Sequence, residues 1–444
     1  MIDLLVIGAG LSGLVAAQTA ADAGLRVRII SKGLNALHWS AGTVDVLGYL
    51  PDVGTPVEAP LGAVESLQRP EHPYRRLGRQ RVEAVLSDFV SLSQRLALPY
   101  KGAAAQGINL LLPSPAGAAR PSFLAPEAQH NGNLREQSPM LIVGFHRLRD
   151  FYPELIAENL SRQGYQARAA FLPIALITDR DDFNTVQLAG AVERPEHVQR
   201  LGKALQRLAR PGERIGLPAM LGMERHNEVM AQLQKTTGAT IFEIPTLPPS
   251  VPGIRLFRRL QEHLRQSGVR VEAGMEAIGA STSGRPPRVD WVATETSARP
   301  LRHRARYFLL ATGGILGGGF ASDHTGRVRE VVFDLPLSVP QRRNSWFRTS
   351  FLDPRGHPVF EGGVRVNDAG QPVDEDGHIL YENLWAAGDV LAGADPIQER
   401  SLEGIAIATG AAAGQSIVAT HTAVNGTSAV PNGAAATSST RNSS

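Results

Sequence analysis

The chain contains no cysteine in 444 residues, and this absence limits its chemistry. Without a thiol it can form no disulfide, use no thiol nucleophile and ligate no iron–sulfur cluster through cysteine. Any electrons that the chain handled would therefore have to leave through another carrier.

An excess of charge of one sign is also missing. The 45 Lys and Arg residues nearly balance the 42 Asp and Glu residues, which leaves a formal net charge of +3. This balance does not suggest a nucleic-acid-binding surface, so no nucleic-acid partner is expected. No metal site is predicted either.

Long hydrophobic runs are scarce as well. We expect no stretch long enough to cross a bilayer, which needs about 20 apolar residues. The apolar N-terminus carries Asp3 and has no basic leader region, so it does not predict a signal peptide. We therefore expect a soluble protein whose membrane association, if any, comes through a partner.

Glycine, in contrast, is placed with a clear pattern at the N-terminus. Gly8, Gly10 and Gly13 follow an apolar run at residues 4–7 and open a helical pattern at residues 11–23. In such a strand–turn–helix unit the glycines allow the turn, the approach of a phosphate, and close packing of helix on strand. The spacing predicts a dinucleotide-type site, with the pyrophosphate at the helix N-terminus.

The acidic residue that normally binds the adenosine ribose is missing from this unit. The second predicted strand, residues 25–30, is followed by Ser31 and Lys32. At this point two explanations remain open. Lys32 could meet the extra phosphate of NADP, or the site could belong to a flavoprotein class whose second strand ends in Ser-Lys.

Two later strand ends favour the flavoprotein. An apolar strand ends in Ala311-Thr312-Gly313-Gly314, and another, from Leu384, ends in Gly388-Asp389 before an Ala-rich helix at residues 404–418. Flavoproteins with two dinucleotide-type units place both turns beside the cofactor, and the Gly-Asp carboxylate binds ribitol hydroxyls. The expected cofactor contacts are Gly8, Gly10, Gly13, Ser31, Lys32, Thr312, Gly313, Gly314, Gly388 and Asp389.

The pattern predicts an α/β fold, a Rossmann-like dinucleotide (flavin)-binding domain with an inserted substrate or cap domain. The flavin-binding domain is expected in three parts, residues 1–60, 250–322 and 376–424. Residues 61–249 are expected to form the inserted substrate or cap region, residues 323–375 a segment returning to the cap, and residues 425–444 a disordered tail.

Several blocks resemble a known family. The stretch from Ser31 to Asp45 contains Leu37-His38-Trp39-Ser40, and similar blocks occur at residues 248–256, 311–314 and 382–397. The chain resembles the B-subunit of anaerobic glycerol-3-phosphate dehydrogenase and, more distantly, the fumarate reductase and succinate dehydrogenase flavoprotein group. In some members of that group a nearby His is bonded to the flavin. His38 is one position off that spacing, so no covalent bond is predicted.

The resemblance implies oxidation of sn-glycerol 3-phosphate to dihydroxyacetone phosphate, with electrons passed through partner subunits to quinone. It also implies pairing with the larger flavoprotein A-subunit and with the membrane-bound iron–sulfur C-subunit of the same dehydrogenase. The chain would then be cytoplasmic and peripheral to the inner face of the membrane. The family is described as using FMN, whereas the glycine motif favours FAD, and this conflict stays open at the level of sequence.

His38, Ser40 and Asp45 are the candidates for proton handling or flavin contact, because they follow the second strand near the expected ring site. Arg255, Arg342 and Arg343 are the candidates for holding a substrate phosphate, since guanidinium groups bind phosphate through two prongs. Two other functions remain open. The chain could be a stand-alone flavoprotein dehydrogenase or reductase acting on another small substrate, or a non-catalytic subunit that relays electrons.

Overall fold

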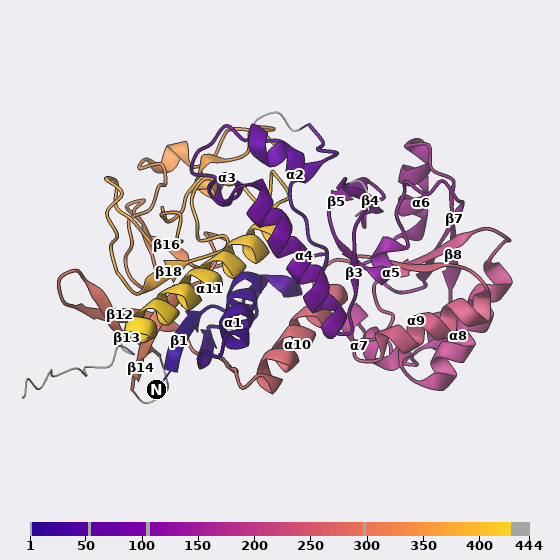
Figure 1. The fold of residues 1–444 in the computed structure, drawn as a ribbon. Helices are drawn as coiled ribbons and strands as arrows, with labels where there is room; N and C mark the ends of the chain where they lie inside the picture. Colours follow the sequence, from indigo (N-terminus) through magenta and orange to yellow (C-terminus); the bar gives the residue numbers. More distant parts are fainter. Residues whose placement is uncertain (1, 52–54, 104–106, 296–298, 428–444) are drawn as a thin grey trace, which may run out of the picture.

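The computed structural model describes residues 2–51, 55–103, 107–295 and 299–427. Figure 1 shows two lobes, one around α1 and α11 and the other around α6, α8 and α9.

A parallel sheet forms the centre of the first lobe. Its strand order is β11-β2-β1-β15-β18, and every neighbouring pair runs parallel. The strands are β1 (Ile2–Ile7), β2 (Val27–Ser31), β11 (Arg270–Ala273), β15 (Ala305–Leu310) and β18 (Leu384–Ala386). Because strands from distant parts of the sequence converge here, their carboxyl ends meet at one edge, where doubly wound sheets bind ligands. The predicted α/β fold is confirmed.

Helices cover one face of this sheet. They are α1 (Leu11–Asp22), α4 (Arg79–Arg95), α10 (Val251–Gln266) and α11 (Leu402–Thr427). Leu4 and Val6 of β1 point to this side and share a hydrophobic core with Leu14, Leu260 and Ile407. The alternation of β1 residues between the two faces explains why the whole strand is apolar.

An antiparallel sheet covers the opposite face. It consists of β12 (Ala277–Ser283), β13 (Arg288–Thr294) and β14 (Leu301–His303). Val289 and Val292 of β13 pack with Leu5 and Phe308 of the parallel sheet. The first lobe is therefore a three-layer domain with its central sheet buried on both sides.

A second parallel sheet builds the other lobe. Its order is β10-β9-β7-β8, with β7 (Met140–Phe145), β8 (Ala167–Leu172), β9 (Arg214–Pro218) and β10 (Ile241–Ile244). The surrounding helices are α6 (Pro153–Arg162), α7 (Thr185–Val192), α8 (Pro195–Leu208) and α9 (His226–Thr237). The fully buried Phe242 and Leu233 belong to the separate core of this lobe.

Shorter elements connect these layers. They are α2 (Pro60–Ala63), α3 (Pro73–Leu77), α5 (Glu127–His130), β3 (Tyr100–Lys101), β4 (Leu110–Pro113), β5 (Ala119–Ser122), β6 (Ala125–Pro126), β16 (Phe320–Ser322) and β17 (Val328–Glu330). Single 3-10 turns lie at Ala36–His38, Val64–Ser66, Ile174–Leu176, Arg343–Ser345 and Pro358–Glu361.

The predicted domain boundaries need two corrections. Leu61, Tyr74 and Val82 belong to the core of the first lobe, so the inserted region does not begin at residue 61. The core of the second lobe instead runs from Ala128 to Ile254. Residues 323–375 do not return to this cap, because Val332, Leu335, Val364 and Val366 pack with the central sheet. Residues 428–444, the greater part of the predicted tail, lie outside the described residues.

Helix α11 corrects the expectation about long apolar runs. Residues 402–425 are long and apolar enough to cross a membrane by length and composition alone. Most of this segment is buried in the protein, however, where α11 packs along α1. Burial in the core explains its apolar composition, since a helix that is apolar all round needs cover on every side.

A buried ion pair ties α10 to the second lobe. Arg255 donates from Nη1 and Nη2 to both carboxylate oxygens of Glu243 in β10, at 2.8 and 2.9 Å, and neither side chain is more than 2% exposed. Arg255 also donates from Nε to the carbonyl oxygen of Gly222 at 2.7 Å. Because α10 contributes Ile254 to one core and Leu260 to the other, this pair fixes the helix that joins the two lobes.

We predict that Arg255→Ala lowers the free energy of unfolding by about 3–5 kcal/mol, because it leaves the Glu243 charge buried without a partner. Urea denaturation measures this change. The matched control is Arg258→Ala on the same helix, whose pair with Glu224 is about half exposed and should contribute no more than about 1 kcal/mol. Equal stability of the two variants would contradict the assignment.

Candidate functional site

The site lies where β1 turns into α1. Gly8 has a φ of +118°, and a Cβ there would stand 2.1 Å from the carbonyl oxygen of Ala311. A Cβ on Gly13 would stand 2.1 Å from the carbonyl oxygen of Gly8, whereas one on Gly10 would meet nothing within 4 Å. The three glycines thus make the turn, open a space and allow close packing, as their spacing predicts.

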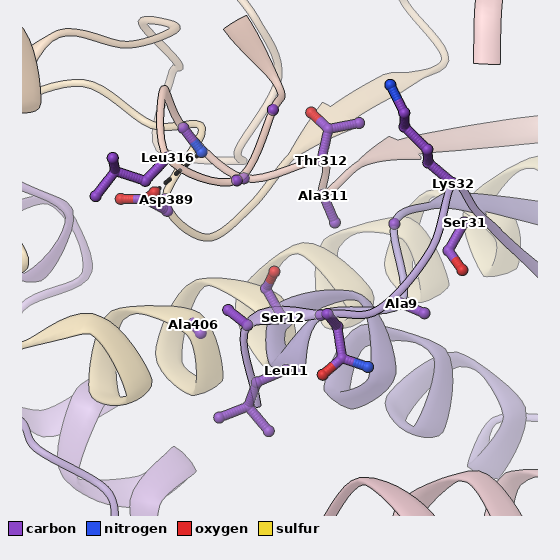
Figure 2. Close-up of a pocket in the computed structure, with 18 of the residues that line it drawn as sticks. Ala9, Leu11, Ser12, Ser31, Lys32, Ala311, Thr312, Leu316, Asp389 and Ala406 are labelled. Carbon is purple, nitrogen blue, oxygen red and sulfur yellow. Dashed lines mark hydrogen bonds between the residues drawn. The ribbon is translucent and has the colours of Figure 1, made fainter. Parts of the chain in front are cut away.

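That open space is a cavity of about 580 Å³. It is lined by the β1–α1 turn, the segment after β2, the residues after β11, the turn after β15 and the start of α11. Figure 2 shows side chains from the β1–α1 turn, the end of β2, the turn after β15 and α11 around it, with Lys32 at one end and Asp389 and Leu316 at the other. The cavity therefore runs along the carboxyl edge of the parallel sheet.

The start of α1 is open to a ligand. No side chain caps its first N–H groups, and its first turn carries no acidic residue. The N-terminus of a helix with free N–H groups attracts an anion such as a pyrophosphate.

The turn after β15 brings a second stretch of glycine-rich backbone to the cavity. Gly313 has a φ of +81°, and a Cβ on Gly319 would overlap the carbonyl oxygen of Gly313. The Oγ1 of Thr312 lines the cavity, is buried and has no hydrogen-bond partner among the described residues. Buried hydroxyl groups are normally hydrogen-bonded, so Thr312 fits a bound group that supplies a partner.

Asp389 contributes the carboxylate at the end of β18. Its Oδ2 accepts a hydrogen bond from the backbone N–H of Gly314 at 3.0 Å. Burial raises the pKa of Asp389 to about 6. Gly388 does not line the cavity, but its φ of +85° and its closeness to Ser12 bring this turn against α1.

Together these groups fit an extended flavin nucleotide. The helix N-terminus suits the pyrophosphate, and Asp389 and Thr312 offer polar partners for hydroxyl groups further along the cavity. The missing Cβ of Gly10 leaves room for the backbone to approach the phosphates.

Ser31 and Lys32 line the opposite end of the cavity, as expected. The Nζ of Lys32 lies 2.6 Å from Oε1 of Glu276, another lining residue. An extra ribose phosphate at Lys32 would meet this carboxylate, so the NADP explanation loses its main support.

Of the three residues predicted to handle protons, His38, Ser40 and Asp45, the structure places only one in the cavity lining. Ser40 lines the cavity. His38 does not; its ring lies 5.3 Å from that of Phe257, its Nδ1 has no hydrogen-bond partner among the described residues, and burial lowers its pKa. The absence of a covalent bond to His38 stays a prediction.

Asp45 also turns away from the cavity. It is 6% exposed, accepts hydrogen bonds from Ser122 Oγ at 2.7 Å and Thr43 Oγ1 at 2.9 Å, and pairs with Arg120 at 3.1 Å. Its proposed catalytic role is corrected to a structural one, because these three partners and its burial keep the carboxylate away from the cavity.

The predicted phosphate-binding arginines lie elsewhere too. Arg255 is wrong as a ligand because Glu243 and Gly222 occupy its guanidinium inside the protein. Arg342 and Arg343 are exposed and outside the cavity lining, and Arg343 lies over the ring of Trp346 at 5.6 Å. No arginine or histidine lines the cavity within the described ranges.

Sequence reasoning missed two lining carboxylates, Glu276 and Glu403. Glu276 follows β11, whose place beside β2 is not visible from the sequence. Glu403 is the second residue of α11, and the strand that ends at Gly388-Asp389 could have indicated that the following helix begins at the cofactor.

The same features occur in a known class of domain. A family model described as an FAD binding domain matches residues 3–405. Fold and site thus define an FAD-binding flavoprotein, and the flavin is FAD, as the glycine motif predicts, rather than FMN.

Similar proteins from three organisms narrow the class. A probable B-subunit of anaerobic glycerol-3-phosphate dehydrogenase from Halobacterium salinarum is 34% identical, over 93% of this chain and 96% of that protein. The B-subunit of this dehydrogenase from Pectobacterium carotovorum is 34% identical, over 91% of this chain and 96% of that protein. The B-subunit from Vibrio cholerae is 31% identical, over 94% of this chain and 97% of that protein. The chain belongs to the B-subunit family of anaerobic glycerol-3-phosphate dehydrogenase.

Among solved structures, a flavocytochrome c3 fumarate reductase in its open conformation aligns at 11% identity with a TM-score of 0.44, covering 94% of this chain and 78% of the other.

We predict that Gly10→Ala weakens FAD binding at least about tenfold, which corresponds to about 1.4 kcal/mol. The new methyl group would occupy space at the phosphate cradle without touching the protein itself. Fluorescence titration of the apo-protein with FAD measures the affinity.

The matched control is Gly190→Ala, on an exposed position of α7 that is also free of neighbours within 4 Å. It should leave FAD affinity unchanged. Wild-type affinity in Gly10→Ala would show that the phosphates do not lie at the β1–α1 turn.

Proposed function

We propose that this chain is a flavin-binding subunit of an anaerobic glycerol-3-phosphate dehydrogenase complex. In this role it takes part in the oxidation of sn-glycerol 3-phosphate to dihydroxyacetone phosphate, and electrons pass through partner subunits to quinone. The single observation that carries the proposal is the cavity at the β1–α1 turn of a chain whose relatives, along almost their whole length, are named as the B-subunit of this dehydrogenase.

Bound FAD supplies the hydride acceptor for the oxidation of an alcohol. The residues of the chain position this cofactor. The N-terminus of α1 would hold the pyrophosphate, and Asp389 and Thr312 would offer hydrogen-bond partners to the cofactor. The buried side chains of Ile7 and Val332 would keep water from the part of the cavity that they line. Ser40 and Glu403 are further polar residues of the cavity lining.

Electron transfer beyond the flavin is assigned to partner subunits. The chain has no cysteine for an iron–sulfur cluster, so a cluster that carries the electrons onward would belong to another protein. Leu34, Trp39, Leu316 and Ile397 all line the cavity and are 54–77% exposed, which suits a protein surface laid over its mouth. We propose that the flavoprotein A-subunit and the membrane-bound iron–sulfur C-subunit fill these roles, which would hold the chain at the inner face of the cell membrane.

One observation favours a second candidate, a non-catalytic subunit that relays electrons. The charged residues of the described cavity lining are Lys32, Glu276, Asp389 and Glu403, and Lys32 is paired with Glu276. Guanidinium and ammonium groups commonly bind the phosphate of a substrate, and in the relay the partner protein would supply such a cation.

We predict that sn-glycerol 3-phosphate, added without oxygen to the complex with its partner subunits, bleaches the visible flavin absorbance. The same addition to the isolated chain separates the candidates. Bleaching in both supports catalysis in this chain, and bleaching in the complex alone supports the relay. No bleaching in either, with another small substrate reducing the isolated chain, would overturn the proposed function in favour of a stand-alone flavoprotein.

A further inference from the structure

Glu403 stands in the cavity at the start of α11. It lines the cavity together with Leu402 and Ala406, and its side chain is only partly exposed. The solvent that reaches it on the cavity side would be displaced by a cofactor that fills the cavity.

The two arginines whose charges act on this carboxylate, Arg120 and Arg400, pair with Asp45 instead. Arg120 Nη1 lies 3.1 Å from Asp45 Oδ2, and Arg400 Nε lies 3.5 Å from the same oxygen. Within the part of the chain that the structure describes, Glu403 has neither an ion pair nor a hydrogen bond to another side chain. Its direct partner among the described residues is its own backbone N–H at the start of α11, which lowers the pKa of Glu403 less than burial or the charge of Asp45 raises it.

The other groups packed around Glu403 do not change this. Tyr74 and Tyr100 face it from α3 and β3, and burial keeps both phenols neutral by raising their pKa. Glu399 and His72 are bound to each other at 3.0 Å. Burial first, and then the negative charge of Asp45, raises the pKa of Glu403 to about 7, although Arg120 and Arg400 act in the opposite direction.

We propose that Glu403 meets bound FAD as a neutral carboxylic acid, so that FAD binding near neutral pH takes up a proton from solution. FAD removes the water that solvates the carboxylate, and a charge without an ion pair in such a place is converted to its neutral form. The neutral acid can then donate its O–H to an acceptor of the cofactor.

The sign of the pH dependence follows from linkage. Below pH 7 most Glu403 side chains already hold the proton, so the FAD affinity should change little with pH in this range. Above pH 7 the proton must be added on binding, so the dissociation constant of FAD should rise toward about tenfold per pH unit. At pH 7, Glu403 should take up about half a proton for each FAD that binds.

Calorimetric titration of the apo-protein with FAD, in buffers of different ionisation enthalpy, counts these protons without any substrate. Glu403→Gln should lose the uptake assigned to Glu403, and its FAD affinity should depend less steeply on pH between pH 7 and pH 8.5 than that of the wild type. The matched control is Glu276→Gln, which removes a lining carboxylate that is paired with Lys32 and should leave the uptake unchanged.

Asp389 is the other lining acid with a raised pKa, so Asp389→Asn measures its share separately. Proton uptake that is unchanged in Glu403→Gln and lost in Asp389→Asn would overturn the proposal. If Glu403→Gln does not fold, the wild-type profile alone decides: an FAD affinity that is independent of pH above 7 contradicts the inference. Because no substrate is used, this failure is distinct from a failure of the proposed function.

Discussion

The cavity depends on the close approach of three backbone turns at the carboxyl edge of one parallel sheet. A Cβ at Gly8 would collide with Ala311, one at Gly13 with Gly8, and one at Gly388 with Ser12. Each collision would separate the strand ends that surround the cofactor. The cavity is therefore shaped first by the absence of side chains and only then by the side chains that line it.

Electrostatics in this cavity is sparse and local. The cation Lys32 is neutralised by Glu276 at one end, and the acids Asp389 and Glu403 lie toward the other with pKa values raised by burial. Outside the cavity, Asp45 and Glu243 each hold an arginine in a buried pair, and the pair of Glu243 fixes the helix that joins the two lobes. Two kinds of acid thus coexist: acids in buried ion pairs that support the fold, and two acids without an ion pair that line the cavity.

Local sequence patterns predicted the elements that carry the cofactor, because each is encoded within a short window. The strand, turn and helix around Gly8 to Gly13 and the two later strand ends lie where their apolar runs and glycines indicate. What failed depended on contacts between distant residues. Arg255 resembles a phosphate ligand until Glu243 is seen beside it, and His38 resembles a catalytic group until its ring is seen packed on Phe257. The domain boundary at residue 61 failed for the same reason, since only packing assigns Tyr74 and Val82 to the first lobe.

The geometry of the β1–α1 turn and of the cavity beside it calls for a complete FAD that is bound without a covalent link. Mass analysis of the cofactor released from the denatured protein tests this most directly. We expect FAD to be released and the protein to keep the mass of its unmodified sequence. Release of FMN would contradict the account, because FMN has no pyrophosphate for the β1–α1 turn to bind. Flavin that stays attached to the protein would contradict the position of His38 outside the cavity.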